Sequence, residues 1–257
     1  MVVAMVNDDG QPLYALGDVH GQLDLLKQAH ARAERDGGEQ ARIVHLGDLI
    51  DRGPDSRGVI DYLMNGQAQG RDWPVVKGNH DEKLPRFLEN PRWIDPGPSR
   101  PQLWTEDLKN GAEATFASYG IPDSGNLPLD ELHEKAIAAI PAEHAAWLDA
   151  LPLYLKEGGD LLFVHAGIRP GIPLEDQSPT DLMWIRRPFH DSSADHGMLV
   201  VHGHTPVDQV THYGNRLNLD TGAAYGGPVS VVRFDADEVW LLTDGDPIPV
   251  QPRPAQG

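Results

Sequence analysis

Cysteine is absent from this sequence of 257 residues. Without a thiol, the chain forms no disulfide bond and offers no thiolate ligand to a metal ion. It also lacks the nucleophile of enzymes that work through a covalent cysteinyl intermediate. Cysteine-dependent phosphatases and proteases are therefore excluded.

Basic residues are also scarce, with 21 lysines and arginines against 39 aspartates and glutamates, which leaves a formal net charge of −18. Nucleic acids and anionic membranes are usually bound by clustered positive charge, so we expect neither as a partner.

Long apolar runs are missing as well, because no segment approaches the roughly 18 residues that cross a bilayer. The first six residues are mostly apolar, but no positive charge precedes them and two aspartates follow directly. A secretory signal peptide has a different pattern. We therefore expect a soluble, cytoplasmic protein.

The hydrophobic pattern of the first third of the chain alternates short apolar runs with helical periods, which is typical of βαβ units. We expect strands at 13–16, 42–46 and 74–77, and helices at 22–35, 56–64 and 82–88. Runs rich in β-branched residues follow residue 159 and favour antiparallel strands. These runs are 161–165, 198–201, 216–219, 229–234 and 239–242. The sequence predicts an α/β fold, a two-sheet sandwich flanked by helices.

Proline divides the rest of the chain. Four prolines between Pro91 and Pro101 interrupt the alternating pattern, and residues 104–151 are predicted to be largely helical. We interpret 91–151 as a helical insertion within a single domain that spans residues 1–246. The Pro-rich tail at 247–257 is expected to be an extended, mobile end.

Residues able to bind metals follow five of the expected strands, at the edge where open α/β sheets bind ligands. A single Asp after a strand is most often a turn or cap residue, and a single buried His most often packs in a core. Five such groups together instead indicate one shared site. Mixed carboxylate, amide and imidazole ligands suit Mn, Fe or Zn better than Ca or Mg. The groups are GDVHG at 17–21, GDLIDRG at 47–53, GNHD at 78–81, HAG at 165–167 and HGHT at 202–205.

These motifs resemble those of the calcineurin-like metallophosphoesterases, and are most similar to the bacterial and phage branch of the phosphoprotein phosphatase family. Symmetrical dinucleoside tetraphosphatases are related to this branch. The matching segments are GDVHGQ at 17–22, GDLIDRGPDS at 47–56, GNHDEK at 78–83, HAGIRP at 165–170, GHTP at 203–206 and DTGAAYGG at 220–227.

The resemblance implies a dinuclear metal centre with two divalent ions (Mn, Fe or Zn). A metal-bound hydroxide would attack phosphorus directly and in line, without a covalent enzyme intermediate. By motif, Asp18 and His20 bind the first metal and Asp48 bridges both. The resemblance assigns the second metal to Asn79, His165 and His204. His202 is then a packing residue.

Arginine is expected to bind the phosphoryl group. Two divalent ions, two aspartates and a hydroxide leave a net charge of only +1, and arginine matches a phosphoryl dianion with two hydrogen bonds. Arg52 lies beside the bridging aspartate, and Arg186 follows a tryptophan at the spacing of bacterial family members, with its neighbour Arg187 as the alternative. Tyr225 is expected either at the mouth of the site or packed at a strand end.

His80 and Asp51 are expected to supply a proton to the leaving group. His80 directly follows the ligand Asn79 and would act as a general acid. Asp51 resembles the family aspartate that orients this histidine, and such a pair raises the pKa of the imidazole. Asp81 and Glu82 are interpreted as helix-capping acids. The histidines outside these motifs are interpreted as surface or packing residues.

The expected activity is that of a serine/threonine protein phosphatase, with acceptance of phosphotyrosine left open, and with a phosphoprotein or phosphopeptide as its substrate. The alternative is a symmetrical bis(5'-nucleosyl)-tetraphosphatase, or Ap4A hydrolase, with a dinucleoside polyphosphate as its substrate. Asp51 favours the first reading, because the symmetrical enzymes tend to lack this acid, and so does the negative net charge. The aromatic residues of the insertion either cap the cleft or form a small core.

A remote alternative is an inactive phosphoprotein-binding module. It would require a broken ligand or acid, and every motif here is intact. The choice among the three metals and the oligomeric state stay open at this point.

Overall fold

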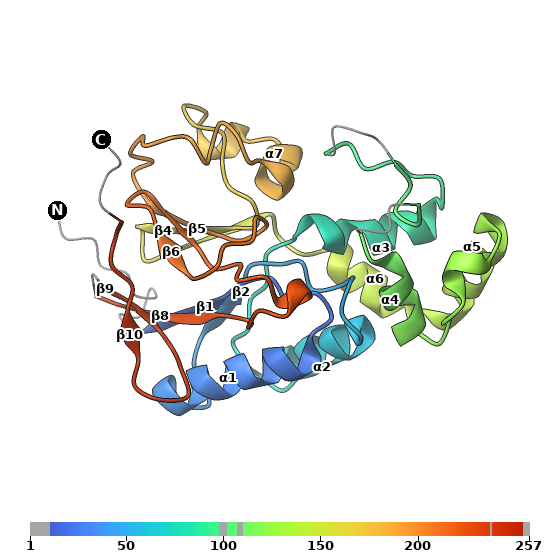
Figure 1. The fold of residues 1–257 in the computed structure, drawn as a ribbon, viewed down its shortest axis with the longest axis horizontal. Helices are drawn as coiled ribbons and strands as arrows, with labels where there is room; N and C mark the ends of the chain where they lie inside the picture. The colour runs from blue at the N-terminus through green and yellow to red at the C-terminus, as the bar shows by residue number, and fades with distance from the viewer. Residues whose placement is uncertain (1–10, 98–101, 107–109, 237, 254–257) are drawn as a thin grey trace.

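The computed structural model describes residues 11–97, 102–106, 110–236 and 238–253. The expectations for the first ten residues, for 98–101 and 107–109 of the insertion, and for 254–257 of the tail lie outside the described residues. Two five-stranded sheets face each other, and helices cover their outer surfaces (Figure 1). This is the α/β sandwich predicted from the sequence.

The first sheet has the strand order β10-β9-β8-β1-β2. Its strands are β1 (Leu13–Leu16), β2 (Ile43–His45), β8 (Val231–Asp235), β9 (Glu238–Leu241) and β10 (Ile248–Pro249). β1 is parallel to β2 and antiparallel to β8. α1 (Leu23–Gly37) and α2 (Ser56–Ala68) lie on the outer side of this sheet (Figure 1).

The second sheet has the order β3-β4-β5-β7-β6. Its strands are β3 (Tyr154–Glu157), β4 (Leu161–Val164), β5 (Leu199–His202), β6 (Thr211–His212) and β7 (Arg216–Asn218). β4, β5 and β7 run parallel, so the expectation of antiparallel neighbours is wrong for these strands. The reason is a long crossover between β4 and β5 through α7 (Pro179–Trp184), which returns the chain in the same direction.

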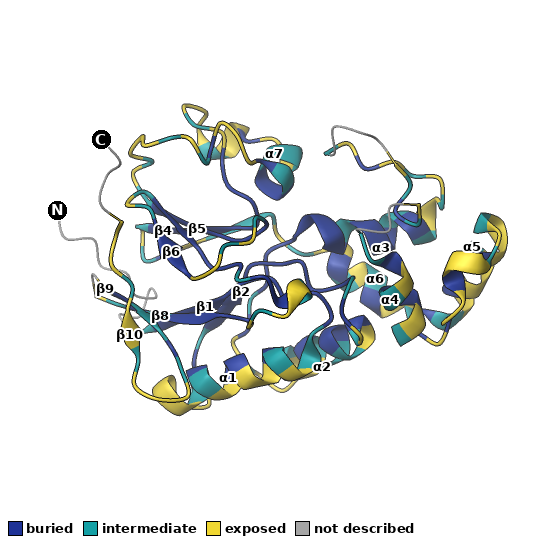
Figure 2. Cartoon of the chain, viewed as in Figure 1, coloured by how far each residue is buried: buried dark blue, intermediate teal, exposed yellow. Residues whose placement is uncertain are grey.

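Side chains alternate across each strand and form the layers of the core. In β1, Leu13 and Ala15 face the second sheet, whereas Tyr14 packs among the residues beneath the helices. Phe163 of β4 crosses from the second sheet and meets Phe234, with 5.7 Å between ring centroids. Figure 2 shows the strands buried in the middle of the molecule and the outer faces of the helices exposed.

The insertion is largely helical from residue 112 onward, whereas its described residues before that form turns and an isolated bridge between Ile94 and Leu103. It follows α3 (Asn79–Glu89) and contains α4 (Ala112–Ser118), α5 (Leu129–Ala139), α6 (Ala142–Asp149) and the short 3-10 helix η1 (Ser124–Asn126). α5 and α6 pack against α3, and α4 packs against α2. Trp104, Phe116 and Tyr119 belong to the core cluster that also contains residues of α1 and α2. The insertion is therefore fixed to the half of the molecule that carries β1 and β2.

The structure differs from three of the expectations about local structure. The segment 74–77 contributes a single bridge between Val75 and His45, because Pro74 has no N–H to donate to a longer ladder. α3 begins at Asn79 rather than at residue 82, which places two motif residues in its first turn. The described part of the tail, up to residue 253, is not free, because β10 pairs with β9 and the Arg253 N–H donates to the carbonyl of His212.

Among the described residues, no helix combines the length and apolar character needed to span a membrane.

Candidate metal centre

The five motifs converge because the strands before them end at one edge of the sandwich. β1 and β2 are parallel neighbours in one sheet, and β4 and β5 are parallel neighbours in the other. A hydrogen bond of 2.8 Å from Nδ1 of His165 to the carbonyl of Leu46 joins the loop after β4 to the end of β2. The carboxyl ends of both sheets therefore face one shared site.

The backbone of these loops is left-handed at the residues that carry the chemistry. The φ angles are 45° at His20, 49° at Asp48, 74° at Asp51, 69° at Arg52 and 66° at His204. Such values are uncommon for residues with a Cβ and turn each side chain sharply out of the strand direction.

Glycine makes the close approach of these loops possible. A Cβ at Gly78 would lie 2.3 Å from Oδ1 of Asp48, and one at Gly203 would lie 2.0 Å from Oδ1 of Asp18. The glycines of the motifs are thus required by packing against the site aspartates.

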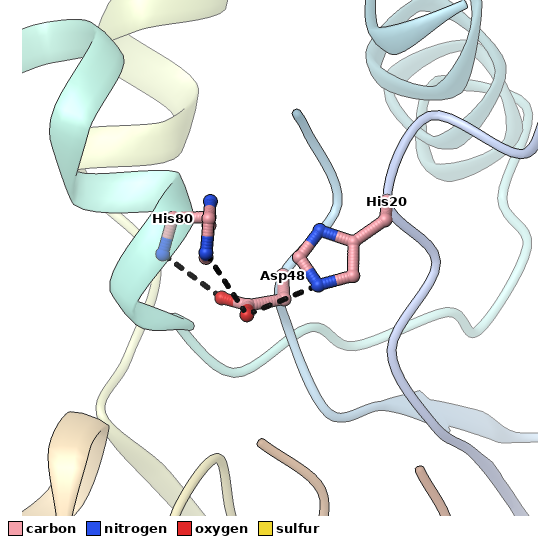
Figure 3. Close-up of side chains that lie close together, drawn as sticks. All are labelled: His20, Asp48 and His80. Atoms are coloured by element: carbon pink, nitrogen blue, oxygen red, sulfur yellow. Dashed lines mark hydrogen bonds and ion pairs between the residues drawn. The ribbon is translucent and has the colours of Figure 1, made fainter. Parts of the chain in front are cut away.

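The first group of possible metal ligands consists of His20, Asp48 and His80, all buried (Figure 3). Oδ2 of Asp48 lies 3.5 Å from Nε2 of His20 and 4.0 Å from Nε2 of His80. Nδ1 of His20 donates to the carbonyl of Ile50 at 2.9 Å, so Nε2 is the ring nitrogen that carries the lone pair. Burial lowers the pKa of His20 to about 4, so this nitrogen is unprotonated at neutral pH.

The second group consists of Asp48, His165 and His204, again buried. Nε2 of His165 lies 3.3 Å from Oδ1 of Asp48 and 3.0 Å from Oδ1 of Asn79. Nε2 of His204 is buried and has no hydrogen-bond partner among the described residues. A buried polar atom without a partner is costly, and a metal ion would satisfy this nitrogen.

Asp18 contacts one residue of the second group. The backbone N–H of His204 lies 3.2 Å from both carboxylate oxygens of Asp18. Its side chain belongs to neither of the two three-residue groups. Burial and the nearby carboxylate of Asp220 raise the pKa of Asp18 above its usual range. Burial alone would lower the pKa of His165, but Asp48 and Asp18 raise it to about 10. The site thus holds an excess of buried negative charge, and its donor set fits divalent cations.

The pair of His80 and Asp51 is formed as the sequence suggested. Nδ1 of His80 donates to Oδ2 of Asp51 at 2.6 Å, and Trp104 Nε1 donates to the same oxygen at 2.9 Å. Thr115 Oγ1 donates to the other oxygen at 2.7 Å. Three donors hold this buried carboxylate in one orientation.

The expected rise in the pKa of His80 is wrong for this structure. Burial, followed by the positive charge of Lys83, lowers the pKa of His80 well below its usual 6.5. Burial also raises the pKa of Asp51 to about 7, although Lys83, Thr115 and Trp104 act against this rise. His80 therefore holds a neutral imidazole at neutral pH when no further negative charge is nearby.

Arg52 lies against both histidines of the first group. Its NH1 is 2.6 Å from Nε2 of His20, and its NH2 is 3.0 Å from Nε2 of His80. Its guanidinium also lies 5.6 Å from the centre of the ring of Tyr225, which is 69% exposed. The structure thus places Arg52 and Tyr225 together at the rim of the site.

Arg186 and Arg187 point to different partners. Nε of Arg186 donates to Thr205 Oγ1 at 3.3 Å, in the residue after His204. Arg187 is paired with Asp191 at 3.2 Å and is largely exposed. Of the two arginines, Arg186 is the one beside the metal-binding loops.

Several residues around the site were not identified as site residues from the sequence. Asp81 accepts hydrogen bonds from the N–H groups of Gly78, Asp48 and Leu49 at 2.8 to 2.9 Å. It is the helix cap that was expected, and it also holds the loop of Asp48. The signal was its place three residues after Gly78, at the third position of the helix.

Lys83 is buried and donates to Asn110 Oδ1 at 3.0 Å. Its Nζ also lies 5.3 Å from the centre of the Trp184 ring. Its position three residues after His80 puts both on one face of α3, which is a signal present in the sequence. Thr115 and Trp104 come from the insertion, and nothing local in the sequence linked them to Asp51.

Known proteins resemble this chain over most of its length. The family model described as calcineurin-like phosphoesterase matches residues 12–237. The asymmetrical bis(5'-nucleosyl)-tetraphosphatase PrpE of Anoxybacillus flavithermus is 27% identical over 214 residues, which cover 75% of this chain and 75% of that protein.

Two solved structures have a similar fold. A proposed diadenosine tetraphosphatase superposes with a TM-score of 0.61 and 20% identity, covering 96% of both chains. The cold-active protein-tyrosine phosphatase of a psychrophilic Shewanella species has a TM-score of 0.60 and 16% identity, covering 93% of this chain and 80% of the other. At these identities the two structures support the fold alone.

Proposed function

We propose that this metallophosphoesterase, which belongs to the calcineurin-like phosphoesterase family and hydrolyses phosphoester bonds, acts on a dinucleoside tetraphosphate. The observation that carries this proposal is the name of the curated relative from Anoxybacillus flavithermus, matched over three quarters of both chains. It favours the substrate of the alternative stated above, a dinucleoside tetraphosphate, over the phosphoprotein substrate that the sequence suggested first.

Asp51 does not weigh against this choice. The acid was taken as evidence against symmetrical tetraphosphatases, whereas the curated relative is named for asymmetrical cleavage. We therefore propose asymmetrical cleavage, in which water adds at a terminal phosphorus and the products are a nucleoside triphosphate and a nucleoside monophosphate.

We propose that the residues of the two ligand groups hold two divalent ions, with Asp48 as a ligand in both sites. His20 and Asp18 would complete the first site. Asn79, His165 and His204 would complete the second. Ions held there would supply positive charge to the phosphoryl oxygens and activate a water for attack on phosphorus. Mn, Fe and Zn all suit this donor set.

Arg52 and Arg186 are proposed to bind phosphate oxygens. Arg52 already lies against both histidines of the first group, so its guanidinium is next to the place where the reaction would occur. Arg186 approaches from the loop of His204. Their planar, permanently charged groups suit the several anionic oxygens of a polyphosphate. Tyr225, beside Arg52, is proposed to contact the substrate at the rim.

His80 is proposed to donate a proton to the leaving group, oriented by Asp51 through Nδ1. A bound polyphosphate brings negative charge close to Nε2 and raises the pKa of the imidazole from its low value. An anhydride needs this proton less than an alkyl ester does. A nucleotide phosphate, with a second pKa near 6, leaves readily as an anion, whereas an alkoxide needs a proton.

Initial rates in excess Mn test the substrate class. We expect kcat/KM for diadenosine tetraphosphate to exceed that for phosphoserine, phosphothreonine and phosphotyrosine peptides by at least about ten-fold, or 1.4 kcal/mol of transition-state binding. Separation of the products by anion exchange distinguishes ATP plus AMP from two ADP. Asp48→Asn is the matched negative control and should lose bound metal and all turnover.

A higher kcat/KM for the phosphopeptides would contradict the proposal and favour a protein phosphatase. No turnover of any substrate by metal-loaded protein would favour the binding module instead.

A further inference from the structure

The insertion contains a partly open cavity of about 220 Å³ that is separate from the metal-binding groups. It lies between α4, η1, the start of α5 and the segment 103–106. Its walls are about equally apolar and polar, with leucine and phenylalanine side chains forming the apolar part. The lining residues are Leu103, Thr105, Glu106, Ala112, Glu113, Phe116, Ser124, Gly125, Leu127, Leu129 and Leu132.

Two polar features of the cavity point to a ligand. Ser124 is only 2% exposed, and its hydroxyl has no hydrogen-bond partner among the described residues. A buried hydroxyl in this state costs free energy that a ligand with a matching group would recover. Glu106 and Glu113 add two carboxylates, and the described lining holds no lysine or arginine. The cavity therefore favours hydrogen-bond donors and disfavours phosphate.

The cavity and the reaction site share two walls. In α4, Phe116 lines the cavity while its neighbour Thr115 donates to Asp51. In the preceding segment, Leu103 lines the cavity while Trp104 donates to Asp51. The rings of Trp104 and Phe116 lie 5.1 Å apart between centroids, so one layer of side chains separates the two places.

We propose that this cavity binds the nucleobase of the substrate, a planar uncharged ring that carries an amino group. This inference rests on the proposed function. The apolar part of the walls suits the faces of the ring, and Ser124 and Glu113 offer acceptors to an exocyclic amine. The polyphosphate stays outside, because its charge is repelled by the two carboxylates and attracted by Arg52.

Two variants test the cavity. Leu127→Trp fills it from a half-buried position, and Ser124→Ala removes only the unpartnered hydroxyl. We expect Leu127→Trp to raise KM for diadenosine tetraphosphate about ten-fold with little change in kcat, and Ser124→Ala to raise it by a smaller factor. Both variants should hydrolyse p-nitrophenyl phosphate, which has no nucleobase, like the parent protein. Ile137→Trp is the matched control, since Ile137 is 56% exposed on α5 outside the cavity.

An unchanged KM for diadenosine tetraphosphate in both variants would overturn the cavity proposal and leave the proposed function intact. Turnover of p-nitrophenyl phosphate without turnover of diadenosine tetraphosphate would instead overturn the proposed function. In that case calorimetry with adenosine decides on the cavity. Binding by the parent protein that Leu127→Trp abolishes and Ile137→Trp retains would support it, and absence of binding by the parent would refute it.

Discussion

Thr115→Val should weaken the link between the insertion and the site more than any other change of equal size in α4. Thr115 is fully buried, and its hydroxyl donates to Oδ1 of Asp51 at 2.7 Å and accepts from the N–H of Asp51 at 3.0 Å. Valine keeps the shape and removes both of these bonds, together with the bond of 3.0 Å between the hydroxyls of Thr115 and Ser56. The N–H retains Ser56 as an acceptor, but Oδ1 loses the hydrogen bond from Thr115.

The cost follows from the charge of the acceptor. A hydrogen bond to a charged group contributes about 1.5 to 3 kcal/mol, so we expect the free energy of unfolding to fall by about 2 kcal/mol. For a chain of this length that is a decrease in Tm of roughly 4 to 8 °C. Thr115 also lowers the pKa of Asp51, which burial has raised to about 7. The variant should therefore protonate Asp51 more readily, orient His80 less well and lower kcat.

Urea unfolding and steady-state kinetics measure both effects. Ser118→Ala is the matched control on the same helix, because its hydroxyl donates to the carbonyl of Thr115 without touching Asp51. It should cost about 1 kcal/mol or less and leave kcat unchanged. A double-mutant cycle with Asp51→Asn isolates the pair. Equal costs for Thr115→Val and Ser118→Ala, or full additivity in the cycle, would refute the reasoning.

Three further predictions follow from other parts of the molecule. His80→Gln should slow hydrolysis of an alkyl phosphate about 10²-fold or more but diadenosine tetraphosphate much less, because only the alkoxide needs the proton; equal losses in kcat would contradict the proposed acid. Burial lowers the pKa of His45 from 6.5 to about 4. The neutral imidazole therefore contributes its full stabilisation above pH 6.5. As the pH falls to 4, protonation of the unfolded chain lowers the free energy of unfolding by about 3 kcal/mol. Urea unfolding between these pH values should show a shallower loss in His45→Gln than in the parent, and the same slope in both would count against it. Deletion of residues 248–257 uncovers the edge of β9 and should increase self-association in light scattering, whereas a monodisperse truncated protein would speak against edge protection by β10.

The elements predicted well are those whose pattern is local. β1 and β4 are four-residue apolar runs buried on both sides, and they were placed within a residue of their bounds. β6 and β10 were missed because two residues carry too little pattern, and β3 because it is only partly buried; all three are strands because a neighbour pairs with them. The parallel direction of β4, β5 and β7 depends on the path of the connecting chain, which composition does not encode.

α7 was missed although its signal was present. Ser178 accepts a hydrogen bond from the N–H of Asp181 at 3.0 Å, and Pro179 follows at the first helical position. This is the usual start of a helix. Six residues were too few for a hydrophobic period to support it.

For the candidate site, too, the residues with a local sequence signal were selected and those that arrive from distant segments were not. Residues such as Asp48 and His204 were found because their side-chain types recur at strand ends. Thr115 and Trp104 were not, because they reach Asp51 from more than fifty residues away. The pKa of His80 was misjudged for a related reason. A pair of residues was considered alone, whereas burial and Lys83 decide the direction of the shift.

Backbone strain shows how the rest of the fold supports this site. Six non-glycine residues of the described chain have positive φ angles, and five of them are His20, Asp48, Asp51, Arg52 and His204. Each such conformation costs of order 1 kcal/mol or more and persists only where the surroundings fix it. Asp81 fixes the Asp48 loop through three backbone bonds, and the Arg52 N–H donates to the carbonyl of Gly111 in the insertion. The insertion therefore stabilises the strained turn that presents Asp51 and Arg52, which gives it a structural reason to lie beside the site whatever its cavity binds.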